Sequence, residues 1–209
     1  MEVYIAGEDA VTLTIIKRLI NIYRPDISVI SEMPYRGGKL DQAIPNLNVL
    51  SNKYPVVLLR DLDMYDCPPQ LIARLIPSPK SENFIVNIAT DEAEAWLLGD
   101  SENFAEYFGI PIGFLPGSIL KRQNGPRTVT EIDTPYKTSQ YFVRYLLPLT
   151  TNQTIFQQLQ PKVGAVKGAE YNHVMLPFIR TVWNPETARL KSHSLNRMIL
   201  RLSNFKGPH

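Results

Sequence analysis

The chain has 209 residues, of which 44% are hydrophobic, and its 22 Lys and Arg nearly balance its 20 Asp and Glu. This composition excludes fibrous, collagen-like and disulfide-rich proteins and is typical of a globular protein with one sizeable core. The single cysteine, Cys67, cannot form an internal disulfide and fits a reducing compartment. No run approaches the roughly 18 apolar residues of a membrane span, and the N-terminus resembles no cleavable leader, so we expect a cytoplasmic protein that does not contact a membrane.

The charges are distributed unevenly along the chain. Residues 1–104 carry 9 Lys and Arg against 15 Asp and Glu, a net charge of -6, whereas residues 105–209 carry 13 against 5, a net charge of +8. One interpretation is that the two parts neutralise each other. The other is a division of labour, in which the acidic part holds metal ions and the basic part binds the phosphates of a nucleic acid. We expect a metal-binding core over residues 1–104 and a basic, mainly helical extension packed on it over residues 105–209.

Over the first hundred residues, short apolar runs alternate with stretches in which apolar residues recur at helical spacing. This alternation predicts an α/β fold in which helices flank a parallel sheet of about four strands. Asp9 is a suitable N-cap for the first helix, and Pro25 ends it. The expected strands are residues 3–6, 27–30, 56–59 and 84–88, and the expected helices are residues 11–23, 45–53, 69–75 and 91–98.

The pattern changes beyond Phe104. Residues 110–135 contain several prolines and glycines and few periodic apolar residues, so no strand is predicted there. Three later segments have apolar residues at helical spacing, and in the last two Arg and Lys lie between them. The helices expected are residues 138–147, 172–182 and 194–202.

Three acidic residues follow predicted strands. Glu8 comes two residues after the first strand, and Asp61 and Asp63 come just after the third. Because parallel strands deliver their following loops to one edge of the sheet, we expect these carboxylates to converge. Like charges held close together resist ionisation unless a cation lies between them, and hard oxygen ligands suit Mg²⁺ or Mn²⁺. The alternative is a solvated turn for Asp61 and Asp63, with Glu8 merely a favourable charge near a helix N-terminus.

Other residues carry weaker signals. Lys167 is a candidate to neutralise a phosphate or the pentacovalent transition state, with a solvated lysine as the alternative. The run from Arg36 to Leu40 lacks the glycine spacing and the Ser or Thr of a phosphate-binding P-loop. His173 and His193 have no accompanying Cys pair, so no zinc site is expected.

Two runs carry a resemblance to a known catalytic module. Val-Tyr-Ile-Ala-Gly-Glu at residues 3–8, before a helix, and Val-Leu-Leu-Arg-Asp-Leu-Asp at residues 57–63 resemble the TOPRIM module of topoisomerases, primases and OLD-type nucleases. The wider chain, from about residue 1 to residue 202, resembles a TOPRIM-like bacterial family often encoded beside ABC-type ATPases in defence loci. The segments that carry this wider likeness are residues 92–100, 167–172 and 192–195.

The resemblance implies metal-dependent phosphodiester chemistry on DNA or RNA. It implies that Glu8 acts as a general acid/base or a ligand, that Asp61 and Asp63 hold Mg²⁺ or Mn²⁺, and that Glu94 completes a second metal site. It also implies an ABC-type ATPase as a partner. One position departs from the pattern: OLD-type modules often have a second acidic residue one turn after the first, and this chain has Thr12 there. Asp9 or Glu94 is the candidate substitute.

The principal hypothesis is therefore a divalent-metal-dependent nuclease. The alternative is a non-catalytic subunit that binds nucleic acid or a partner and whose acidic cluster is vestigial. A third hypothesis is a phosphotransferase or nucleotide-processing enzyme that uses the same carboxylates on a small substrate.

Overall fold

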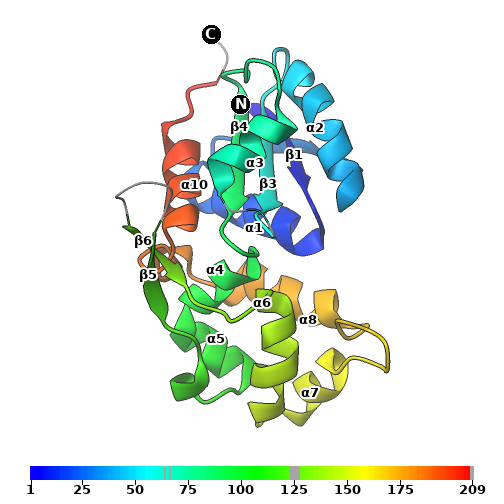
Figure 1. Ribbon diagram of the computed structural model, residues 1–209, viewed down its shortest axis with the longest axis vertical. Coiled ribbons are helices and arrows are strands. Elements are labelled where there is room, and N and C mark those ends of the chain that lie inside the picture. The colour runs from blue at the N-terminus through cyan, green and yellow to red at the C-terminus, as the bar shows by residue number, and fades with distance from the viewer. Residues whose placement is uncertain (64, 66, 123–127, 208–209) are drawn as a thin grey trace. The chain divides into compact units, whose positions relative to one another are not determined.

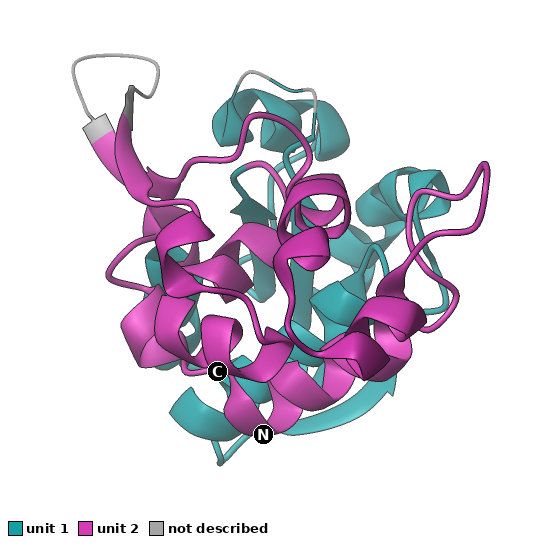
Figure 2. Ribbon diagram, turned by 90° about the horizontal axis from the view of Figure 1, so that it is seen from below, with its two compact units in different colours: residues 1–90, 196–209 teal, residues 91–195 magenta. Residues whose placement is uncertain are grey.

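The structure is a computed structural model of the chain (Figure 1), and it describes all residues except 64, 66, 123–127 and 208–209. Its internal contacts form two compact units, one of residues 1–90 with 196–209 and one of residues 91–195 (Figure 2). The first unit ends before the boundary expected at residue 104, and it includes the last residues of the chain.

The first unit is built on a parallel sheet of four strands within the described residues, in the order β2-β1-β3-β4. The predicted α/β fold with about four parallel strands is confirmed. The central strand β3 is buried along nearly its whole length, which is typical of a parallel sheet covered on both faces. The strands are β1 (Glu2–Gly7), β2 (Ser28–Glu32), β3 (Val56–Asp61) and β4 (Phe84–Ala89).

Helices α1 (Ala10–Tyr23), α2 (Gly38–Leu50) and α3 (Pro68–Leu75) follow successive strands. Asp9 caps α1 as predicted, because its side chain accepts a hydrogen bond from the Thr12 amide at 2.9 Å and the Thr12 hydroxyl oxygen accepts one from the Asp9 backbone amide at 3.0 Å.

Helix α2 begins seven residues before the predicted start, so Pro45 lies inside the helix and not in its first turn. Leu40, Ile44 and Leu47 share one face of this helix and are buried in the core beside β3. Burial of these side chains offsets the hydrogen bond that the proline removes.

The end of the chain returns to the first unit through α10 (His193–Asn204), whose residues from Asn196 onward belong to this unit. Arg201 Nη1 donates to the Val86 carbonyl at 2.6 Å, so α10 lies beside β4 (Figure 1). Arg24 Nη1 donates to the Leu202 carbonyl at 2.9 Å. These bonds join the C-terminal segment to both α1 and the outer strand of the sheet.

The second unit is mainly helical, as predicted for the C-terminal part of the chain. The rings of Phe104, Phe108, Phe142 and Phe178 form its core, with neighbouring centroids 4.4 to 5.6 Å apart. The elements are α4 (Glu94–Gly99), α5 (Ser101–Phe108), η1 (Ile112–Phe114), β5 (Ser118–Arg122), β6 (Thr128–Ile132), α6 (Thr138–Tyr141), the π-helical turn η2 (Phe142–Leu146), η3 (Leu147–Leu149), α7 (Gln153–Leu159), α8 (Tyr171–Pro177), the π-helical turn η4 (Phe178–Val182) and α9 (Pro185–Ala188).

The prediction that residues 110–135 contain no strand is wrong. Strands β5 and β6 pair with each other in an antiparallel ladder. Ile119 and Leu120 of β5 are 44% and 69% exposed. This hairpin therefore lacks the apolar run of a buried strand, and its hydrogen bonds are local to the pair.

Among the described residues, the structure contains no helix with both the length and the apolar character needed to cross a membrane.

Candidate functional site

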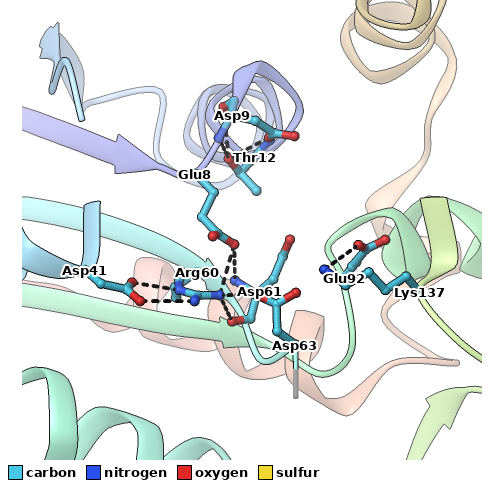
Figure 3. A network of polar contacts seen from close by, with 9 residues as sticks. All are labelled: Glu8, Asp9, Thr12, Asp41, Arg60, Asp61, Asp63, Glu92 and Lys137. Atoms are coloured by element: carbon cyan, nitrogen blue, oxygen red, sulfur yellow. Dashed lines mark hydrogen bonds and ion pairs between the residues drawn. The ribbon is translucent and has the colours of Figure 1, made fainter. Parts of the chain in front are cut away.

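Glu8 and Asp61 meet at the carboxyl ends of β1 and β3. The two strands are paired in parallel, with Gly7 opposite Leu59, so the residues that follow them emerge side by side. Glu8 Oε2 accepts a hydrogen bond from the Asp61 backbone amide at 3.2 Å (Figure 3). The pairing of these strands thus brings two distant parts of the chain together at one edge of the sheet.

A buried arginine lies at the centre of these acidic residues. The Arg60 side chain is 7% exposed, and its Nη1 donates to Glu8 Oε2 at 3.1 Å and to Asp63 Oδ2 at 2.7 Å. Its Nε and Nη2 both donate to the carboxylate of Asp41, which is on α2 (Figure 3). We call Glu8, Asp41, Arg60, Asp61 and Asp63 the carboxylate–arginine cluster.

Neither Arg60 nor Asp41 was expected at the site from the sequence. Arg60 directly follows four apolar residues of β3, and a buried cation in such a position requires anionic partners close by. That signal points to a charged cluster, but it does not identify Asp41, which comes from a different element.

The cluster carries an excess of negative charge, since four carboxylates against one guanidinium leave a formal charge of -3 when all are ionised. Burial raises the pKa of Glu8, and the charges of Asp63 and Asp41 raise it further, while Arg60 and the Asp61 amide oppose this shift. Burial alone would lower the pKa of Arg60, but its hydrogen bonds to Asp41 and Asp63 and the charge of Glu8 raise it overall. Arg60 is therefore firmly positive, and Glu8 holds a proton more readily than an exposed glutamate.

Asp63 reaches Arg60 from a left-handed backbone conformation, with φ 52°. Few residues other than glycine adopt this conformation, although aspartate tolerates it better than most. Strained backbone of this kind occurs often at functional sites. Here it turns the chain directly after β3, where the carboxylates converge.

The chemistry of carboxylate oxygens suits Mg²⁺ or Mn²⁺, but the arrangement of these residues does not form a ready metal site. Arg60 Nη1 binds oxygens of both Glu8 and Asp63. Within the part of the chain that the structure describes, no three His, Cys, Asp or Glu are grouped so that they could hold a metal ion. A cation that takes these oxygens must compete with Arg60 for them.

Asp9, a candidate for the missing second acidic residue, serves the first helix. Its carboxylate accepts hydrogen bonds from the Thr12 amide at 2.9 Å and from the Thr12 hydroxyl at 3.0 Å. Thr12, which stands where OLD-type modules often have a second acidic residue, is thus the residue that Asp9 binds when it caps the helix.

Glu94 and Lys167, the remaining predicted site residues, pair with each other within the second unit. The Glu94 side chain is 6% exposed, and its Oε1 accepts a hydrogen bond from Lys167 Nζ at 2.9 Å and one from the Tyr171 hydroxyl at 3.3 Å. Lys167 Nζ also lies 4.6 Å from the centre of the Tyr171 ring. The structure therefore assigns Lys167 a carboxylate partner in its own unit.

Comparison of the chain with protein-family models, with curated proteins and with solved structures gives no match.

Proposed function

We propose that the chain is a divalent-metal-dependent nuclease that hydrolyses phosphodiester bonds of DNA or RNA at the carboxylate–arginine cluster. The observation that supports this proposal is the convergence of Glu8 and Asp63 on one nitrogen of Arg60, at the carboxyl ends of two parallel strands. Ligands of open parallel sheets bind at this edge. The excess negative charge of the cluster attracts a divalent cation, and such an ion neutralises charge on a phosphate and activates water.

Within this proposal Glu8 is the residue that moves a proton. Its raised pKa brings the carboxyl group closer to neutrality, and general acid–base catalysis is most efficient when the pKa lies near the working pH. Arg60 holds the Glu8 and Asp63 carboxylates in place and offsets part of their mutual repulsion.

The test is cleavage of plasmid DNA, single-stranded DNA and RNA with Mg²⁺ or Mn²⁺ and with a chelator. We expect the wild type to cleave at least one substrate only with metal, and the double variant Asp61→Asn/Asp63→Asn to lose this activity. Asp26→Asn is the matched control, because Asp26 is an exposed aspartate of the same unit that pairs with Arg24. Equal rates in the wild type and the double variant would remove the cluster as the site.

A second candidate function is a non-catalytic subunit that binds nucleic acid or a partner. The observation that favours it is that Arg60 already acts as the counter-ion of three carboxylates. Calorimetric titration with Mg²⁺ and Mn²⁺ separates the two functions. Absence of metal binding, together with nucleic-acid binding that falls steeply with salt, would favour the binding subunit over the nuclease.

An ABC-type ATPase partner is part of the proposal through the family resemblance alone. Co-purification of the chain with an ATPase encoded beside it would support this partner. No complex at micromolar concentration would count against it.

A further inference from the structure

Three tyrosines form an aromatic cluster on the surface of the second unit. Tyr136 precedes α6, Tyr141 ends α6, and Tyr145 lies in the π-helical turn η2. The rings of Tyr141 and Tyr145 are stacked, with centroids 5.8 Å apart and planes inclined by 18°. The Tyr136 ring meets both of them edge-on, with centroids 6.1 and 5.7 Å away. We call Tyr136, Tyr141 and Tyr145 the tyrosine platform.

The tyrosine platform is not part of the hydrophobic core. Tyr145 is 58% exposed, whereas the four phenylalanines that form the core of this unit are buried. Tyr136 and Tyr141 are partly buried and support the Tyr145 ring, so its orientation is set before any ligand arrives. A fixed ring with much of its surface in solvent is a suitable stacking surface for another aromatic group.

Positive charge accompanies the platform. Arg144 is exposed and is next in sequence to Tyr145. Lys137, next to Tyr136, is also exposed, and its Nζ lies 3.9 Å from the carboxylate of Glu92. Arg144 is close enough to oppose the raised pKa of the Tyr136 hydroxyl, which burial and the neighbouring Tyr145 produce. An exposed tyrosine, Tyr145, and an exposed arginine, Arg144, are thus neighbours on one short segment.

Several acidic side chains of this unit are buried and do not contribute to its exposed surface. Residues 91–195 contain 10 Lys and Arg and 10 Asp and Glu, but four of these acidic residues are buried. Two of the buried carboxylates are bound internally by backbone amides: Glu92 by Ser139 at 2.7 Å and Glu131 by Ser194 at 2.7 Å. The four buried acidic residues are Glu92, Glu94, Asp100 and Glu131.

We propose that the tyrosine platform and Arg144 bind single-stranded nucleic acid, with a base stacked on Tyr145 and a backbone phosphate paired with Arg144. Bases of a single strand have accessible faces, whereas those of a duplex are already stacked on their neighbours. The inference takes its ligand class from the proposed nuclease function and narrows the substrate to single strands, but binding at the platform does not require the carboxylate–arginine cluster to be catalytic.

The test is fluorescence anisotropy of the full-length protein with a labelled oligothymidylate of about 12 nucleotides, in the presence of a chelator. We expect the single strand to bind more tightly than a duplex of equal length. Tyr145→Ala is expected to weaken binding roughly 5- to 150-fold, the range found when one stacking aromatic is removed. Tyr145→Phe is expected to retain the affinity, because the ring is kept.

Two further variants separate stacking from charge and from general effects. Arg144→Gln is expected to reduce the slope of log affinity against log salt by about 0.7, the contribution of one phosphate contact on a single strand. Tyr54→Ala is the control, because Tyr54 is a 49% exposed tyrosine of the first unit, and it is expected to bind like the wild type. Thermal unfolding of each variant shows whether it is folded in the assay.

Undiminished binding by folded Tyr145→Ala would overturn the inference, as would the absence of single-strand binding by the wild type or equal affinity for the duplex. These results are distinct from failure of the nuclease proposal. Single-strand binding that depends on Tyr145, without cleavage under any metal condition, supports the platform and contradicts the nuclease. If Tyr145→Ala leaves both cleavage and single-strand binding unchanged, the result supports the nuclease and contradicts the platform.

Discussion

Arg60 binds Asp41 through two parallel hydrogen bonds, from Nε to Oδ1 at 2.9 Å and from Nη2 to Oδ2 at 3.2 Å. This paired geometry is specific to a planar guanidinium and a carboxylate. It joins the end of β3 to the first turn of α2 and leaves Nη1 directed toward Glu8 and Asp63. One side chain therefore holds acidic residues from three segments of the chain.

Replacement of Arg60 is expected to destabilise the first unit strongly. Arg60→Met leaves partly buried carboxylates without their counter-ion, and breaking a buried ion pair in this way costs roughly 3 to 5 kcal/mol of the free energy of unfolding. The stability of Arg60→Lys is expected to lie between that of Arg60→Met and that of the wild type, because a lysine keeps the positive charge but cannot make the paired hydrogen bonds to Asp41. Urea denaturation measures the change, and Lys53→Met, at an exposed position, is the control. A stability of Arg60→Met equal to that of the control would show that the carboxylates do not depend on this arginine.

Lys167→Met is expected to destabilise the second unit, because the buried Glu94 carboxylate loses a hydrogen bond of 2.9 Å from a charged donor. Loss of a partner from a buried acceptor costs roughly 1 to 3 kcal/mol. The double variant Glu94→Gln/Lys167→Met is expected to recover part of this loss, since no unpaired charge is then buried. Denaturant unfolding of the single and double variants tests this coupling, and Lys162→Met is the exposed control. Strict additivity of the two substitutions would contradict a direct interaction.

Gly168→Ala is expected to destabilise the same unit for a steric reason. A Cβ at this position would lie 2.5 Å from the carbonyl oxygen of Leu159 and 2.6 Å from its carbonyl carbon. Both are backbone atoms at the end of α7, so the clash requires a backbone shift, and overpacking of this kind costs typically about 1 to 3 kcal/mol. Gly113→Ala is the matched control, because a Cβ there meets no atom within 4 Å. Equal denaturation midpoints for the two variants would show that the loop before α8 yields easily.

Lys80 is expected to make the free energy of unfolding of the first unit vary with pH in the alkaline range. Its Nζ donates to the Phe84 carbonyl at 2.9 Å, and burial, followed by the charge of Arg201, lowers its pKa from the ordinary value of 10.5. Between the lowered pKa and 10.5 the unfolded chain binds more protons at this lysine than the folded protein does, so the free energy of unfolding rises with pH in that window. Lys80→Gln removes this contribution. The stability of the wild type relative to the variant should therefore increase as pH rises toward 10.5, as measured by urea denaturation, and parallel pH profiles would contradict the prediction.

Several features of the fold were predictable because they depend on local pattern. The apolar runs of β1, β3 and β4 predict strands buried on both faces, and such strands form a parallel sheet with helices between them. Asp9 identifies the start of α1, because its short carboxylate can satisfy an amide of the first turn. The order of strands and helices also places Glu8 and Asp61 at one edge of the sheet.

Other features depend on partners that are distant in sequence. The start of α2 was wrong in the prediction because the burial of Leu40 and Ile44 outweighs the local preference of Pro45. The hairpin of β5 and β6 was missed because its strands are stabilised by each other and not by a buried apolar run. The return of the C-terminal segment to the first unit depends on Arg24 and Arg201, which bind carbonyls far from them in the chain.

The sequence by itself determined the class of fold and the edge of the sheet at which acidic residues collect, because hydrophobic periodicity and chain direction are local properties. Only the tertiary structure decided that a guanidinium lies among those carboxylates. A buried charge takes its partners from whichever elements pack around it, and here Asp41 is supplied by a helix whose position depends on the core.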